Sequence, residues 1–226
     1  MGPWEVRAAV IELRSKTNLC RFTLYPMIHL ADSSFYDAVA ARLAEHDLVV
    51  AEGIRGKSRA VQLLTRTYRL AALNRKLGPQ LQPMDLHDVG VPTLLPDITA
   101  PEFSLAWRHI SLIERAAINV IALLAVLFLR LFGSREFIAG RLALDDDILN
   151  AKQPSGLEVD RLIRDRRDAL LCAALTNILD THPIDGANVA VVYGAGHVRP
   201  VVDYLRSRHG DVVSRGDWLT IFTLPH

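Results

Sequence analysis

A strand-like run that ends in a glycine turn and a histidine sets the strongest limit on how this chain folds. Residues 189–193 are apolar and mostly β-branched, residues 194–197 are Gly-Ala-Gly-His, and a helix-like segment follows over 201–208. A buried strand that passes through glycines directly into a helix is typical of a parallel α/β sheet. The turn therefore places His197 at the carboxyl end of its strand, where open α/β sheets bind their ligands.

Strand and helix patterns alternate along the rest of the chain. We expect a hairpin of two strands over 4–13 and 20–29, further strands over 47–53, 81–85 and 218–224, and helices over 33–45, 58–77 and 158–179. This alternation predicts an α/β fold with a central mixed, largely parallel sheet flanked by helices. The 226 residues are expected to form one domain, with residues 90–150 as a helical insertion or lid within it.

The expected insertion contains the most apolar stretch of the chain. Residues 116–129 are AAINVIALLAVLFL, in which Asn119 is the single polar residue, and Arg115 and Arg130 flank the stretch. A helix of that length is about 21 Å long, short of the roughly 30 Å hydrocarbon core of a bilayer, but snorkelling of Arg130 would extend it to residue 132. The side chains of an apolar helix must be buried by other groups. For residues 116–132 the sequence allows three: the protein core, a second copy of the chain, or lipid.

Charge, cysteine content and the first residues exclude several classes of protein. The net charge of +1 gives no basic footprint for nucleic acid, so we expect no nucleic-acid partner. Cys20 and Cys172 lie far apart and are expected to be buried thiols without a disulfide. The first residues lack the basic and apolar parts of a secretory signal. We therefore expect a cytoplasmic protein, either soluble or membrane-associated through 116–132.

Four ionisable side chains share one position in the expected sheet. His29, Glu52, Asp85 and His197 each lie at or just beyond the carboxyl end of a strand, so they are expected to converge. One chemistry that fits is a divalent-metal site with His29, Glu52, His197 and Asp85 as ligands, in which the metal activates a water. The other is metal-free hydrolysis, with a histidine or Glu52 as the general base.

Each of these residues also has a structural alternative. A histidine after a strand is often only hydrogen-bonded, Glu52 can accept hydrogen bonds from helix amides, and Asp85 can cap a turn. A dinucleotide-binding fingerprint is excluded, because its third glycine would fall on Arg199. The coincidence at four strand ends is harder to explain structurally than any one of the residues alone.

The same residues, in the same order, resemble the TraB/PrgY/Tiki (GumN-like) family, part of a wider group with erythromycin-esterase-like and ChaN-like proteins. The matching motifs are Pro-Met-Ile-His at 26–29, Glu-Gly at 52–53, Arg-Asp at 167–168 and Gly-Ala-Gly-His at 194–197. The resemblance extends over about residues 20–215. It departs from the family at Pro26, where the family prefers glycine.

The resemblance implies a hydrolase with its pocket at the carboxyl edge of the sheet. Tiki proteins are membrane-associated metalloproteases that use manganese or cobalt, esterase-like relatives hydrolyse esters without needing a metal, and PrgY-type members block a peptide pheromone. We therefore expect Glu52, Arg167 and His197 to be catalytic, with Arg167 as an oxyanion or carboxylate clamp and Arg166 facing solvent.

The resemblance also bears on the cofactor and the partners. The expected metal is Mn, Co or Zn, held by His29, Glu52, His197 and Asp85. The expected substrate is a peptide or a small ester or amide. The alternative is a non-catalytic peptide-binding or membrane-associated regulatory protein on the same fold.

Overall fold

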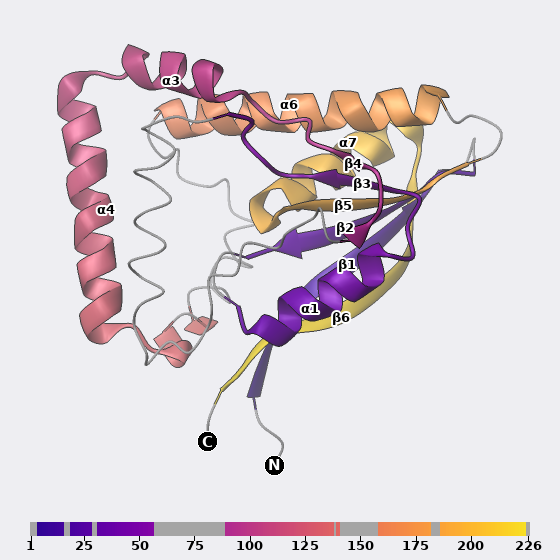
Figure 1. Cartoon of the computed structure of the whole chain (residues 1–226), viewed down its shortest axis with the longest axis horizontal. Helices are drawn as coiled ribbons and strands as arrows, with labels where there is room; N and C mark the ends of the chain where they lie inside the picture. The colour runs from indigo at the N-terminus through magenta and orange to yellow at the C-terminus, as the bar shows by residue number, and fades with distance from the viewer. Residues whose placement is uncertain are drawn as a thin grey trace.

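A computed structural model of the chain confirms the α/β architecture (Figure 1). The structure describes residues 4–15, 19–28, 31–56, 89–137, 139–140, 158–181 and 186–224, with side chains from 164 onward in the segment 158–181. A mixed sheet forms the middle layer and helices cover both of its faces. The helix expected over 58–77 and the strand expected over 81–85 lie outside the described residues.

The sheet has six strands in the order β4-β3-β5-β2-β1-β6. Their bounds are β1 (Trp4–Arg14), β2 (Arg21–Met27), β3 (Leu48–Ala51), β4 (Thr93–Leu94), β5 (Asn188–Gly194) and β6 (Val212–Leu224). The first four strands in this order run parallel, whereas β1 is antiparallel to both of its neighbours. The carboxyl ends of β3, β5 and β2 therefore lie side by side at one edge of the sheet.

Strand pairing explains where the observed strands differ from the expected ones. The β1–β2 hairpin is confirmed, with Ile11 opposite Leu24. The last strand begins at Val212 rather than at residue 218, because β6 pairs with β1 along nearly the whole length of both. The short strand β4 pairs with β3 through Thr93, so the sheet takes its edge strand from within the range 90–150.

Alternate residues of each strand contact different helices, as a pleated sheet requires. Helix α1 (Ser33–Leu43) covers one face, where Phe35 and Val39 pack around Tyr25 of β2. Helices α6 (Glu158–Thr181) and α7 (Val198–His209) cover the other face, where Leu175 packs with Leu24. Cys20 and Cys172 are buried thiols on this second face and form no disulfide with each other, as expected.

Two further helices stand at the side of the sheet (Figure 1). They are α3 (Ala100–His109) and α4 (Leu112–Phe132), and each begins with a capping box: Thr99 with Glu102, and Ser111 with Glu114. Helix α4 contains the apolar stretch, and Val126 is its only buried residue. Within the described part of the chain, α4 is the one helix whose length and composition would suit a membrane span.

Candidate functional site

Two neighbouring parallel strands bring Glu52 beside the glycine turn. Ala51 at the end of β3 pairs with Val192 of β5, and the N–H of Glu52 donates to the carbonyl of Val192 at 2.9 Å. The Gly194 N–H then donates to Oε2 of Glu52 at 2.7 Å. A Cβ atom at position 194 would lie 3.1 Å from this oxygen, so the absence of a side chain allows the close approach.

Arg167 of α6 joins Glu52 to a second carboxylate, Asp97. Its Nη2 donates to Oε1 of Glu52 at 2.6 Å, and its Nε and Nη2 donate to the two oxygens of Asp97 at 2.8 and 2.7 Å. Asp97 also accepts from the N–H groups of Gly53 and Ile98 at 3.1 and 2.8 Å. The Asp97 side chain is fully buried, and those of Arg167 and Glu52 are 15% and 27% exposed.

These contacts keep all three groups ionised. Burial alone would raise the pKa of both carboxyls, but the charge and hydrogen bonds of Arg167, with the backbone N–H donors, lower the pKa of Glu52 and of Asp97. Burial likewise works against the charge on Arg167, yet the two carboxylates raise the pKa of its guanidinium. The result is a buried cluster of two negative charges and one positive charge.

A short helical turn, η2 (Ala195–His197), aims His197 at Asp168 of α6. Nδ1 of His197 lies 2.5 Å from Oδ1 of Asp168, and the two side chains are 10% and 16% exposed. The imidazole also makes an edge-to-face contact with the ring of Tyr193, whose hydroxyl donates to the carbonyl of Pro96 at 3.1 Å. In the neutral imidazole, Nδ1–H donates a hydrogen bond to such a carboxylate, and Nε2 then carries the lone pair. Among the residues described, none bonds to Nε2.

The structure brings together three of the five residues expected at the site. Glu52, Arg167 and His197 meet around Gly194 at the carboxyl edge of the sheet, whereas His29 and Asp85 lie outside the described residues. Arg167 donates to the chain's own carboxylates, and its neighbour Arg166 is exposed, as expected.

Sequence reasoning missed two acidic residues of the site. Asp168 is the partner of His197, and its position directly after Arg167 in a site motif was the available signal. Asp97 binds Arg167, but it follows Pro96 in a loop without any periodic pattern, so nothing local marked it. Both residues act as partners of groups that the sequence did indicate.

The Glu52–Arg167–His197 cluster does not by itself supply enough ligand atoms for a divalent metal. Within the described ranges, no three side chains of His, Cys, Asp or Glu are grouped so as to hold a metal ion. Both oxygens of Glu52 already accept hydrogen bonds, from Arg167 and from the N–H of Gly194. His197 offers Nε2 as one ligand atom, so further ligands would come from His29 and Asp85.

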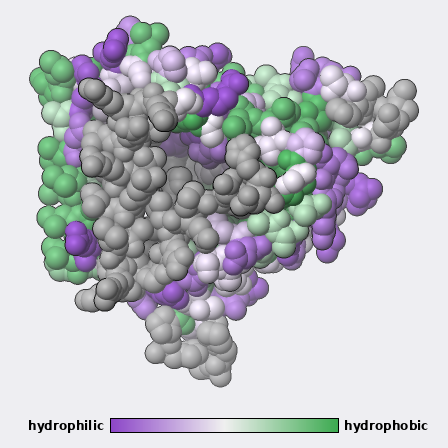
Figure 2. Space-filling view, in the orientation of Figure 1, coloured by the Kyte–Doolittle hydropathy of each residue, from purple (hydrophilic) through white to green (hydrophobic). Residues whose placement is uncertain are grey.

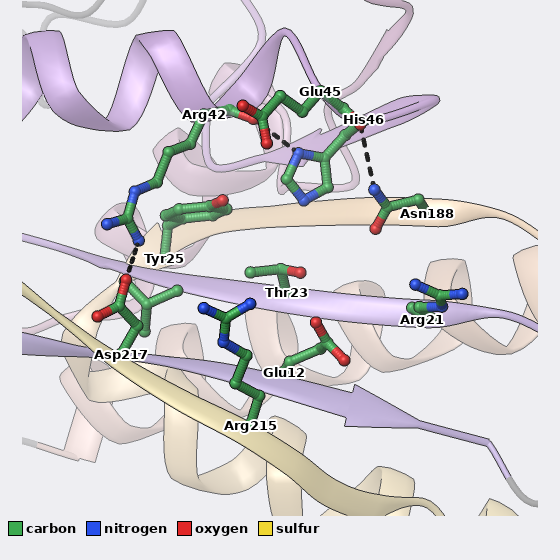
Figure 3. Close-up of a pocket in the computed structure, with 11 residues that line it drawn as sticks. Glu12, Arg21, Thr23, Tyr25, Arg42, Glu45, His46, Asn188, Arg215 and Asp217 are labelled. Atoms are coloured by element: carbon green, nitrogen blue, oxygen red, sulfur yellow. Dashed lines mark hydrogen bonds and ion pairs between the residues drawn. The ribbon is translucent and has the colours of Figure 1, made fainter.

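A separate polar cavity of about 340 Å³ lies on the α1 face, near the amino ends of β2 and β5 (Figure 3). It is lined by Val10, Glu12, Arg21, Thr23, Tyr25, Arg42, Glu45, His46, Asn188, Arg215 and Asp217. Arg42 binds Asp217 at 2.7 Å across it. The formal charges of the three arginines and three carboxylates of the lining balance, and we place the candidate site at the other edge of the sheet.

No family model, no curated protein and no solved structure matches this chain.

Proposed function

We propose that this protein is a hydrolase of the TraB/Tiki type, in which His197 is the general base that activates water. The main support is the buried His197–Asp168 pair at 2.5 Å. A carboxylate at Nδ1 fixes the orientation and tautomer of the ring, leaves Nε2 to accept a proton from water, and stabilises the imidazolium that results. His197 lies at the carboxyl ends of β5 and β3, the edge of the sheet at which α/β proteins bind substrates.

Glu52 contributes negative charge next to the histidine. Its Oε2 is held at the N–H of Gly194, and a Cβ atom at that glycine would lie 3.8 Å from Cδ2 of His197. Because the pKa of Glu52 is lowered, this carboxylate stays ionised and places a negative charge beside His197. Arg167 acts as a positioning residue, because its donors hold Glu52 and Asp97 in place.

A metal-dependent version of the same proposal uses Nε2 of His197 as a ligand. His29 and Asp85 would complete the set around Mn, Co or Zn, and the metal would supply an activated water. Both versions need the same state of His197, with Nδ1 protonated toward Asp168 and Nε2 unprotonated. In both versions the substrate is a peptide or a small ester or amide, as the family resemblance implies.

The test is a hydrolysis assay with p-nitrophenyl esters and fluorogenic peptides, on protein purified without chelator. We expect turnover by the wild type and a loss of roughly 10²- to 10⁴-fold in His197→Gln. The matched control is His209→Gln, since His209 ends the helix that His197 begins, about 18 Å further along its axis. Absence of hydrolysis, or equal rates in the two variants, would contradict the proposal.

A second candidate function is a non-catalytic peptide-binding or membrane-associated regulator on the same fold. It is favoured by the exposed apolar surface of α4 and by the internal pairing of Glu52, both of whose oxygens already accept a hydrogen bond from the protein. This candidate predicts no turnover of any substrate in the assay above.

A further inference from the structure

Helix α4 exposes large apolar side chains over most of its circumference. Those between 45% and 83% exposed are Leu112, Ile113, Val120, Ile121, Leu123, Leu124, Leu127, Phe128, Leu131 and Phe132. Figure 2 shows the resulting hydrophobic surface along the edge of the molecule where Figure 1 places α4. Soluble monomers rarely expose a contiguous apolar patch larger than several hundred Å², so α4 requires a partner or a different solvent.

The protected side of α4 is a single narrow stripe. Its members are half-buried or buried and recur every three or four residues: Arg115, Ile118, Ala122, Val126 and Leu129. At 100° per residue this stripe covers about 80° of the helix surface, and the exposed arc covers about 240°. The exposed arc is apolar apart from the end charges and Asn119.

A second copy of the chain would cover only part of this arc. Ile113, Val120, Leu124, Leu127 and Leu131 lie opposite the protected stripe at heptad-like spacing, which would suit the seam of a coiled coil. In soluble coiled coils, however, the residues that flank the seam are mostly charged. Here the flanking residues are Ile121, Leu123, Phe128 and Phe132, all exposed and apolar. Lipid chains cover such a wide surface, whereas one neighbouring helix does not.

The segments before and after α4 bond to residues that follow β3, lie in β6 or precede α1, so both are held to the body that contains the sheet. Before its start, Ala100 donates to the carbonyl of Arg55 at 2.8 Å, and Phe103 and Ile110 are buried. After its end, Arg135 donates to the carbonyl of Thr223 at 3.0 Å and to Asp32 at 2.9 Å. A helix that crosses a bilayer has its two ends on opposite sides, so these contacts are incompatible with a transmembrane α4.

The charges near α4 suit an anionic membrane surface. Arg108 and His109 precede the helix, and Arg130 lies in its last turn. The single acidic residue of the helix, Glu114, accepts hydrogen bonds from Ser111 in the capping box. Basic residues at the ends of an apolar helix interact favourably with anionic headgroups.

We propose that α4 attaches the protein to a lipid bilayer by lying in the plane of the membrane, with the face of Ile113, Leu124 and Leu131 toward the acyl chains. The sheet and the candidate site remain on the water side, because α4 stands at one edge of the molecule with the sheet to one side of it (Figure 1). This inference does not depend on the proposed hydrolase activity, since none of the residues in its argument belongs to the Glu52–Arg167–His197 cluster.

The first experiment measures binding to vesicles of phosphatidylcholine and phosphatidylglycerol by co-flotation. We expect the wild type to float and Leu124→Lys/Leu127→Lys to bind at least about tenfold more weakly, because two leucines that would enter the bilayer are lost. The control is Leu19→Lys/Val213→Lys, which changes two exposed apolar residues away from α4 and should bind like the wild type. Wild-type protein that stays with the buffer would overturn the proposal, as would a soluble dimer that Leu124→Lys/Leu127→Lys dissociates.

The second experiment measures how deep α4 lies. Nitroxide labels are placed on Ile113→Cys, Leu124→Cys or Leu131→Cys, and their exposure to oxygen and to a water-soluble nickel chelate is compared on vesicles. Cys20 and Cys172 are buried and should not react. We expect similar depths of roughly 5–10 Å for all three labels. A label at position 124 that lies far deeper than the other two would show a spanning helix and overturn the in-plane orientation.

Discussion

Removal of the Arg167 guanidinium should leave two carboxylates facing each other inside the protein. We expect Arg167→Met to destabilise the fold strongly, because Asp97 is fully buried and Glu52 is 27% exposed. Breaking a buried ion pair by deleting one partner costs about 3–5 kcal/mol. For a chain of this size, that corresponds to a melting temperature lower by roughly 6–20 °C. The cost is large against a typical total stability of about 5–15 kcal/mol.

Urea unfolding followed by circular dichroism measures this cost. The matched control is Arg166→Met, since Arg166 is the exposed neighbour on the same helix and should change stability by less than about 0.5 kcal/mol. Adding Asp97→Asn to Arg167→Met removes one of the two orphaned charges, so the double variant should recover part of the loss. Equal stabilities for Arg167→Met and Arg166→Met would refute the reasoning.

The same ion cluster also predicts how the stability of the wild type and of Arg167→Met changes with pH. The pKa values of Glu52 and Asp97 are lowered from ordinary values of 4.5 and 3.8, so in the wild type their contribution is fully present above about pH 5 and is lost as the pH falls through the lowered values. In Arg167→Met, the guanidinium no longer opposes the effect of burial, so both pKa values should lie higher than in the wild type and less stability should be lost as the pH falls below 5. A loss as large as that of the wild type would contradict the assignment of Arg167 as the stabiliser of both charges.

Three further predictions concern the turn, the histidine partner and the metal. Gly194→Ala should lower the free energy of unfolding by about 1–3 kcal/mol, because the new methyl group would lie 3.1 Å from Oε2 of Glu52. Gly196→Ala is the control: its methyl group would enter open space, so thermal unfolding should show a loss of less than about 1 kcal/mol. Asp168→Asn should lower kcat for ester or peptide hydrolysis by roughly 10²- to 10⁴-fold with little change in KM, while Asp203→Asn, exposed on α7, should retain wild-type kcat. If the metal-dependent version holds, mass spectrometry should find Mn, Co or Zn in the wild type and much less in His197→Gln; full turnover after chelator treatment would exclude that version.

Much of the fold follows from local sequence patterns, and the exceptions have a common cause. The first hairpin, the helices over 33–43 and 158–181 and the β5 strand were predictable, because their apolar residues recur with the period of the element. The first half of β6 was not, since residues 212–216 are exposed, residues 214–217 are polar or glycine, and this segment forms a strand only because β1 lies beside it. The two-residue strand β4 was not predictable either, because both of its residues are exposed and it forms by pairing with β3.

The candidate site divides in a similar way. Glu52 and His197 were predictable because each follows a buried strand, and strand ends mark an edge of the sheet. The pairing of His197 with Asp168 and of Arg167 with Asp97 was not, because residues 29 and 70 positions apart in sequence meet only after α6 packs on the sheet. The sequence thus indicated the groups that do the proposed chemistry better than the partners that orient them.

The protonation state of His197 tests the central claim directly, and it can be measured without knowing the substrate. Long-range ¹H–¹⁵N NMR correlations of the ¹⁵N-labelled protein at pH 8 distinguish a protonated ring nitrogen from one with a lone pair, and His197→Gln assigns the signals. The pairing with Asp168 predicts that Nδ1 carries the proton and that Nε2 is unprotonated, with this preference reduced in Asp168→Asn. A proton on Nε2 in the wild type would contradict the claim that this histidine is held ready to accept a proton from water.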